Sequence, residues 1–208
     1  TPPPPTWVTL TGADIGAAAG AGSPTAGGTG AFTVRGSGAD IWGTSDEFFF
    51  AHSVLNGDGE ITARVASLTN TNAWSKAGVM LRETLAANAR FAFMLVTPSN
   101  GIAFQHRTVA GSGAGPDGIG VTGAAPVWVC VRREGSLIRG FMSPDGVNWT
   151  QRATVTLTGL SSSVYIGLAV TSHADGTLAT AQFQNTSIAG TGSTPDTTAP
   201  SVPQNPVA

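Results

Sequence analysis

Five side chains of the kinds that recognise sugars recur in three apolar segments of this chain of 208 residues. They are Trp74, Arg82, Gln105, Arg107 and His173. Alternate residues of a strand point to one face, so we expect the members within each segment to share a face. An aromatic ring stacks on the C–H face of a pyranose, and planar Arg and Gln side chains hydrogen-bond paired hydroxyls or a carboxylate. We expect the five side chains to line one open groove for a glycan, provided that their strands are neighbours.

The same residues have a structural alternative. Arg82 can pair with a carboxylate such as Glu83 or Asp46, and Trp74 can cover a sheet edge. Both interpretations stay open at this point.

Three acidic residues near turns raise the alternative of a structural calcium ion, which takes about six to eight oxygen ligands. They are Asp40, Asp46 and Asp58. No loop has the spacing of an EF-hand, and the histidines at 52, 106 and 173 lack the spacing of metal ligands. We therefore expect no cofactor and keep structural calcium as the alternative.

The segments that position these residues alternate as strands do. Their apolar members are Ala77, Val79 and Leu81, then Val127, Val129 and Val131, then Ile166, Leu168 and Val170. Turn sequences at 56–59, 99–101, 144–146 and 175–176 separate such segments. Residues 75–88 can be argued as a helix, but Gly78 and the alternation favour a strand. We predict an all-β, two-sheet antiparallel β-sandwich, or jelly roll, over residues 7–189.

The other tryptophans and the single cysteine have expected structural roles. Trp42, Trp128 and Cys130 lie in apolar segments and are expected in the core. Trp149 follows the turn at 143–148, which resembles a sialidase Asp-box, and Trp7 is expected to anchor an edge.

Charge and composition narrow the class of partner. Charged residues make up 11% of the chain, and the formal net charge is −2. Nucleic-acid binding needs clustered Lys and Arg, which the sequence lacks. No apolar run approaches the roughly 18–20 residues of a membrane span. We expect a polysaccharide or oligosaccharide as partner, and a monomer.

Both ends of the chain have the composition of linkers. Residues 1–6 are rich in proline, and residues 190–198 are rich in glycine, serine and threonine. Residues 199–208 resemble the opening strand of the fibronectin type III domains of bacterial multimodular secreted enzymes. We therefore expect an extracellular module with neighbouring catalytic and fibronectin type III domains.

Several sequence blocks between these ends resemble one known family. The blocks are 38–43, 57–65, 74–83, 97–107 and 165–173. Together they are similar to the concanavalin A-like, DUF1349-type domains of secreted bacterial carbohydrate-active and surface proteins. The resemblance implies a two-sheet jelly roll with a curved face.

Catalytic patterns of this superfamily are not matched. Its glycosidases use a Glu-x-Asp-x-x-Glu strand, which places two carboxylates on one face and which this sequence lacks. Fragments of alginate-lyase motifs occur, such as Gln105-His106, but in a different order, and the single tyrosine, Tyr165, is remote from Lys76 in sequence. We predict a non-catalytic carbohydrate-binding module. A structural or adhesive spacer and a polysaccharide lyase or hydrolase are the alternatives.

Overall fold

The computed structural model describes residues 8–190, without the side chains of 116–120. The described residues form strands and no helix, so none of them belongs to a membrane-spanning helix. Residues 1–6, Trp7 and the fibronectin-like segment lie outside the described residues, and so does the predicted second linker except for Gly190, which ends the last strand.

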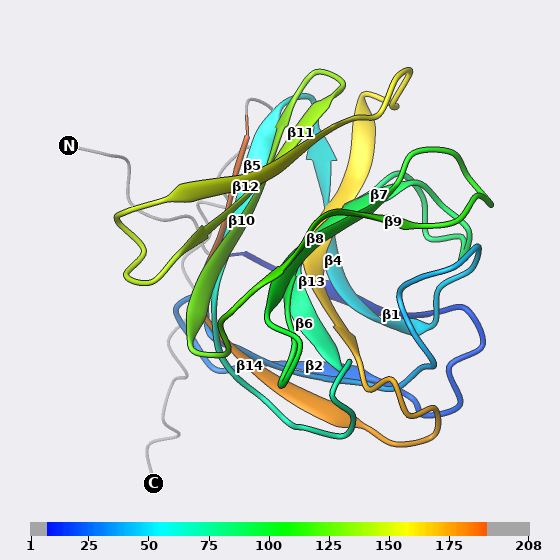
Figure 1. Ribbon diagram of the computed structural model, residues 1–208, viewed down its shortest axis with the longest axis vertical. Coiled ribbons are helices and arrows are strands. Elements are labelled where there is room, and N and C mark those ends of the chain that lie inside the picture. The colour runs from blue at the N-terminus through cyan, green and yellow to red at the C-terminus, as the bar shows by residue number, and fades with distance from the viewer. Residues whose placement is uncertain (1–7, 191–208) are drawn as a thin grey trace, which may run out of the picture.

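Two seven-stranded antiparallel sheets pack face to face (Figure 1). The first sheet has the order β1 (Thr11–Ile15), β4 (Phe48–Asn56), β13 (Ser163–Thr171), β6 (Lys76–Arg82), β7 (Phe91–Val96), β8 (Ile102–Arg107) and β9 (Gly115–Val121). The second has the order β12 (Thr150–Thr156), β11 (Leu137–Ser143), β10 (Val127–Glu134), β5 (Gly59–Leu68), β14 (Ala179–Gly190), β3 (Phe32–Gly36) and β2 (Ser23–Ala26). The predicted all-β sandwich is confirmed.

Turn chemistry separates the strands where the sequence predicts it. Each of the four predicted turns contains a glycine with positive φ: Gly57 at 75°, Gly101 at 76°, Gly146 at 77° and Gly176 at 81°. Residues with a Cβ rarely adopt this backbone conformation, so glycine is favoured there. The segment 75–88 contains strand β6 rather than a helix.

The main hydrophobic core lies between the two sheets. Ala77, Val79 and Leu81 of β6 face inward, and they meet Val129 and Val131 of β10 in one buried cluster. The inward residues of β13 join the same cluster. The period of two in the sequence therefore identified the core side of these strands.

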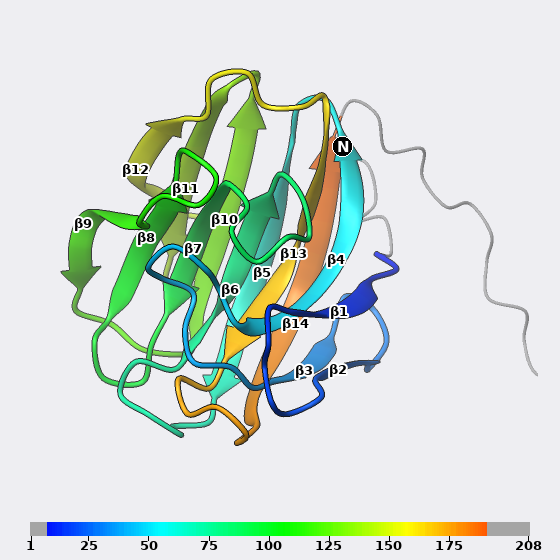
Figure 2. The same cartoon turned by 90° about the vertical axis from the view of Figure 1, so that its right-hand side faces the viewer.

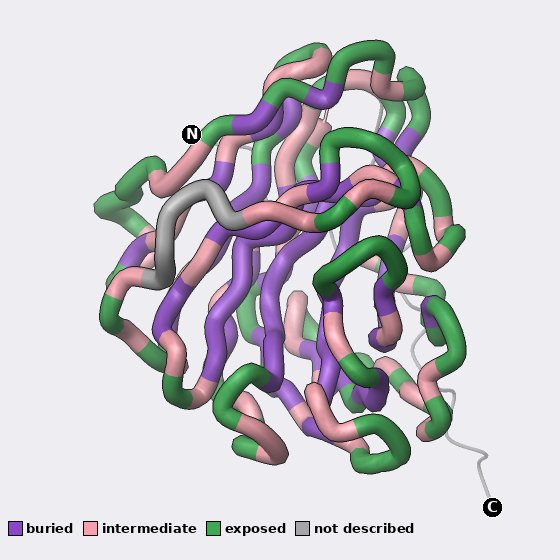
Figure 3. The backbone as a smooth tube through the Cα atoms, turned by 45° about the vertical axis from the view of Figure 1, so that its right-hand side comes forward, coloured by how far each residue is buried: buried purple, intermediate pink, exposed green. Residues whose placement is uncertain are grey.

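The outer face of the first sheet is also buried, which corrects the expectation of an open face. Met80, Phe50 and Phe93 form a second apolar cluster there with Ile41, which comes from the chain between β3 and β4. Figure 2 shows this segment and the one between β6 and β7 crossing in front of the sheet. Figure 3 shows exposed loop backbone lying over buried strands. A sequence signal for double burial was present, because β7 is apolar at every position from 91 to 96.

Candidate functional site

Arg82 and Arg107 are buried beneath the loops that cover the first sheet. Both side chains are 0% exposed, and so is that of Asp46, which lies between them. Asp46 Oδ2 accepts from Arg82 Nη1 at 2.7 Å, and Asp46 Oδ1 accepts from Arg107 Nη2 at 2.7 Å. The expected contact of these two arginines with a ligand is thus corrected. The structural alternative, pairing with Asp46, describes them.

Backbone carbonyls take up further donors of the two guanidinium groups. Arg82 donates to the carbonyl oxygens of Ala86 and Ala87, at 2.5 and 3.0 Å. Arg107 donates to the carbonyl oxygens of Trp42 and Gly43, at 3.2 and 2.9 Å. Burial lowers the pKa of Arg82 and Asp46 opposes that shift, but an arginine stays charged in a protein. The arginines therefore fasten the segments 38–47 and 83–90 to the sheet.

A second polar cluster lies where these loops meet the ends of β6 and β13. Its centre is Lys76, whose side chain is 2% exposed. Lys76 Nζ donates to Asp40 Oδ1 at 2.6 Å, to the carbonyl oxygen of Ile41 at 3.0 Å and to Gln105 Oε1 at 3.1 Å. Burial lowers the pKa of Lys76, and the charge of Asp40 opposes the shift. The ion pair holds Asp40 in one orientation above the sheet.

His173 lies beside Asp40, on the side toward β13. Its Nε2 is 3.3 Å from Asp40 Oδ2, and its φ of 51° lies in the left-handed region. Residues with short polar side chains and histidine are enriched in that region, which nevertheless costs a non-glycine residue free energy. The backbone N–H of His173 donates to Thr171 Oγ1 at 3.4 Å. The chain thus turns sharply after β13 and brings the imidazole to Asp40.

One tryptophan contacts this cluster, and a second lies at the adjoining strand end. Trp42 follows Asp40 and Ile41 in the same loop, and Lys76 Nζ lies 5.6 Å from the centre of its ring. Trp74 precedes β6, and His173 follows β13. These strand ends are neighbours, because Lys76 pairs with Thr171 and Ser75 Oγ donates to the carbonyl oxygen of Ser172 at 2.8 Å. Trp42 is 37% exposed and Trp74 is 45% exposed.

We call this set the rim site: Asp40, Trp42, Trp74, Lys76, Gln105 and His173. It keeps three of the five residues expected from the sequence, with Gln105 buried under Lys76 and only Trp74 and His173 reaching the surface. Asp40 was proposed as a calcium ligand and instead pairs with Lys76 and His173. Trp42 was expected in the core and lies outside it. Its position before Gly43-Thr44-Ser45, a stretch of small exposed residues, was the signal for a loop.

The three aspartates of the calcium alternative have separate partners. Asp46 pairs with the buried arginines, and Asp58 accepts from the backbone N–H of Gly135 at 2.6 Å. Among the side chains that the structure describes, those of 8–115 and 121–190, no group of three or more His, Cys, Asp and Glu is arranged to hold a metal ion. The sequence proximity of Asp40 and Asp46 therefore does not translate into one shared site.

Trp128 and Trp149 lie on the second sheet, remote from the rim site in topology. Trp128 is half-buried on the outer face and not in the core as expected, because its ring packs on Gly146 of the β11–β12 turn. Asp145 Oδ1 accepts from the N–H groups of Val147 and Asn148 at 2.9 and 2.8 Å, as the Asp-box resemblance predicts for a turn. Cys130 is buried nearby, and burial raises the pKa of its thiol to about 12.

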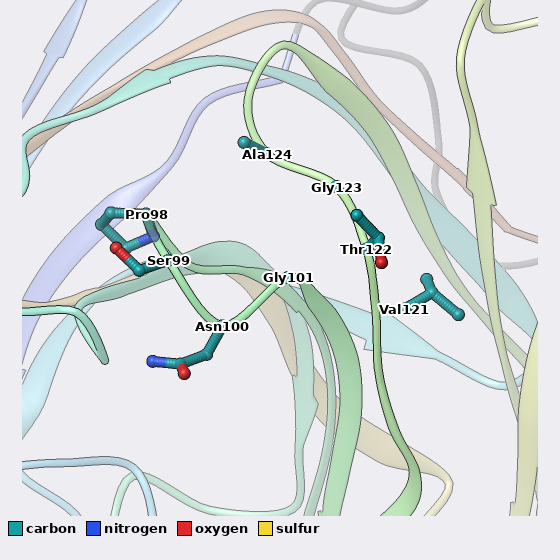
Figure 4. A pocket seen from close by; sticks show the side chains of 8 residues that line it. All are labelled: Pro98, Ser99, Asn100, Gly101, Val121, Thr122, Gly123 and Ala124. Carbon is teal, nitrogen blue, oxygen red and sulfur yellow. The ribbon is translucent and has the colours of Figure 1, made fainter.

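An open pocket of about 560 Å³ lies next to the loop that holds Trp74. It is lined by residues 98–101 and 121–124, mostly small side chains (Figure 4). Asn100 Nδ2 donates to the carbonyl oxygen of Ala73 at 2.8 Å and thereby fixes the backbone beside Trp74. The pocket therefore borders the backbone beside Trp74, and none of its lining residues is charged.

Sequence comparison gives no family for this chain, whereas structural comparison gives its fold. No protein-family model and no curated protein matches it, so the DUF1349-type resemblance stays a prediction. A functionally unknown protein from Saccharomyces cerevisiae has a TM-score of 0.66 at 16% identity, over 88% of this chain and 96% of that one. The GH43 BlXynB protein from Bacillus licheniformis has a TM-score of 0.59 at 12% identity, over 74% of this chain and 31% of that one.

A third similar structure is, by its name, a carbohydrate-binding module. The carbohydrate-binding module CBM66 from Bacillus subtilis has a TM-score of 0.53 at 15% identity, over 88% of this chain and 99% of that one. Identities this low show the fold alone. The chain shares a β-sandwich fold with a carbohydrate-binding module and with part of a GH43 protein.

Proposed function

We propose that this chain is a non-catalytic carbohydrate-binding module whose glycan lies across the rim site. The observation that supports this most is the exposed Trp42 beside the Asp40–Lys76–His173 cluster, with the exposed Trp74 at the adjoining strand end. Indoles present a large apolar face and stack on the C–H faces of pyranose rings. The carboxylate of Asp40 and the imidazole of His173 supply hydrogen bonds to hydroxyl groups of the same glycan.

The glutamates support a non-catalytic role. Glu60 and Glu83 pair with Arg132 and Arg90, and Glu134 pairs with Arg139. Glu47 accepts from the backbone N–H of Ala39 at 3.2 Å. Retaining glycosidases need two carboxyl groups about 5 Å apart and facing one sugar. The structural engagement of each glutamate favours binding over hydrolysis.

In this proposal the parent protein is secreted, and the module tethers a neighbouring catalytic domain to a polysaccharide. Such tethering raises the effective concentration of the neighbouring domain at its substrate, so weak affinity for single sugars suffices. The shared fold with CBM66 agrees with this role.

Retention of the protein in gels that contain soluble polysaccharides tests the proposal. The double variant Trp42→Ala with Trp74→Ala should weaken retention at least tenfold, about 1.4 kcal/mol, because both stacking surfaces are lost. Its melting temperature should stay near that of the wild type, since both indoles are exposed.

Trp149→Ala is the matched control. Trp149 is exposed to the same 37% as Trp42, but it lies in the turn between β11 and β12 of the second sheet. This variant should bind as the wild type does. Equal retention of the wild type and the double variant would remove the rim site from the proposal, and no retention of the wild type in any polysaccharide gel would refute the function itself.

A further inference from the structure

The rim site, taken as the glycan site of the proposed function, also specifies the charge of its ligand. We infer that it accepts uncharged glycans, with sugar hydroxyls donating to Asp40, and that it discriminates against uronates. The inference rests on the proposed function and narrows what the sequence suggested, because Arg82 and Arg107 were expected to bond sugar hydroxyls or the carboxylate of an acidic sugar.

The cations near the site offer no donor that a ligand can reach, because all three are buried. Lys76 is 2% exposed, and its three N–H bonds match three acceptors: Asp40 Oδ1, the Ile41 carbonyl oxygen and Gln105 Oε1. Arg82 and Arg107 are 0% exposed and both pair with Asp46. A ligand carboxylate at the rim therefore finds no ammonium or guanidinium group that it can reach.

The partner of the Lys76–Asp40 ion pair that a ligand can contact is the carboxylate. The Asp40 side chain is 27% exposed, against 2% for its partner Lys76. An ionised carboxylate only accepts hydrogen bonds, so it binds hydroxyl groups and repels another carboxylate. The exposed indole of Trp42 at the same cluster adds apolar area without adding charge.

The hydrogen-bonding capacity of Asp40 is divided between protein and ligand. Oδ1 accepts from Lys76 Nζ at 2.6 Å and from the N–H of Ile41 at 2.7 Å. Oδ2 lies 3.3 Å from His173 Nε2 and keeps a further acceptor position for a sugar hydroxyl. Because Lys76 and Ile41 fix the carboxylate before the ligand arrives, little ordering is lost on binding. A neutral sugar with adjacent hydroxyls fits Asp40 and His173 together.

Paired polysaccharides that differ in charge test the inference. The protein as it exists is run in gels that contain mixed-linkage β-glucan, galactomannan, arabinan, alginate or polygalacturonate. Alginate and its propylene glycol ester form a matched pair, because esterification removes the carboxylate and keeps the backbone. At least one neutral polymer should retard the protein tenfold more strongly than either uronate.

Asp40→Asn separates a charge effect from a structural one. The amide has the same shape and keeps one acceptor, so the ratio of uronate to neutral affinity should rise at least fivefold. A merely structural role of Asp40 would lower both affinities together and leave this ratio unchanged, which would overturn the inference. The inference would also be overturned if the wild type bound a uronate most tightly and the double variant Trp42→Ala with Trp74→Ala abolished that binding. That result would leave the proposed glycan function intact.

Discussion

The two outer faces of the sandwich are built from similar residues and are used in different ways. On the first sheet, Arg82 and Arg107 share Asp46 at 0% exposure and fasten loops over the strands. On the second sheet, Arg132 pairs with Glu60 at 2.6 Å, with side chains 45% and 31% exposed. Exposed ion pairs contribute little to stability, whereas a buried charge that loses its partner is costly. The buried ions of the first sheet therefore position the loop that bears Asp40 and Trp42.

Neutralising Asp46 should give the largest effect. Asp46→Asn leaves two buried guanidinium groups without a counter-charge, so we expect a loss of about 3–5 kcal/mol in the free energy of unfolding. Glu60→Gln, the equivalent change on the second sheet, should cost less than about 1 kcal/mol. Urea denaturation of both variants measures the difference. Equal small losses would contradict the contrast between the two faces.

A smaller, pH-dependent effect should come from His52 on the covered face. Its ring lies 5.2 Å from that of Phe50 and 5.0 Å from that of Tyr165, and burial lowers its pKa from the ordinary value of 6.5. The unfolded chain therefore binds a proton before the folded one does as pH falls. The contribution of neutral His52 to the free energy of unfolding is complete above pH 6.5. It declines as the pH falls from 6.5 to the lowered pKa of the folded protein.

His52→Phe keeps the aromatic contacts and removes the titration. The free energy of unfolding of the wild type should fall between pH 7 and pH 5 more steeply than that of the variant, by less than the Asp46→Asn effect. Parallel pH profiles of the two proteins would show that the imidazole is not desolvated on this face.

The sequence predicts the fold and part of the site, for one physical reason. Alternation decides which face of a strand a residue is on, so Val79 and Leu168 were placed in the core correctly. Alternation does not say whether the other face is open. Arg82 and Arg107 were placed on the correct face but lie beneath loops, whose course depends on contacts distant in the sequence, such as Asp46 with Arg107. Trp42 was misplaced because its neighbour Ile41 is buried while its own ring points outward.

The central claim is that a glycan contacts the indoles of the first sheet and not those of the second, and nuclear magnetic resonance can test it directly. The chain has five tryptophans, and each gives one indole N–H signal that single Trp→Phe variants assign. Titration with the neutral oligosaccharide of the polymer that retards the protein most should shift the signals of Trp42 and Trp74. Those of Trp128 and Trp149 should stay in place. Shifts confined to Trp128 and Trp149, or no shift at saturating oligosaccharide, would contradict the account.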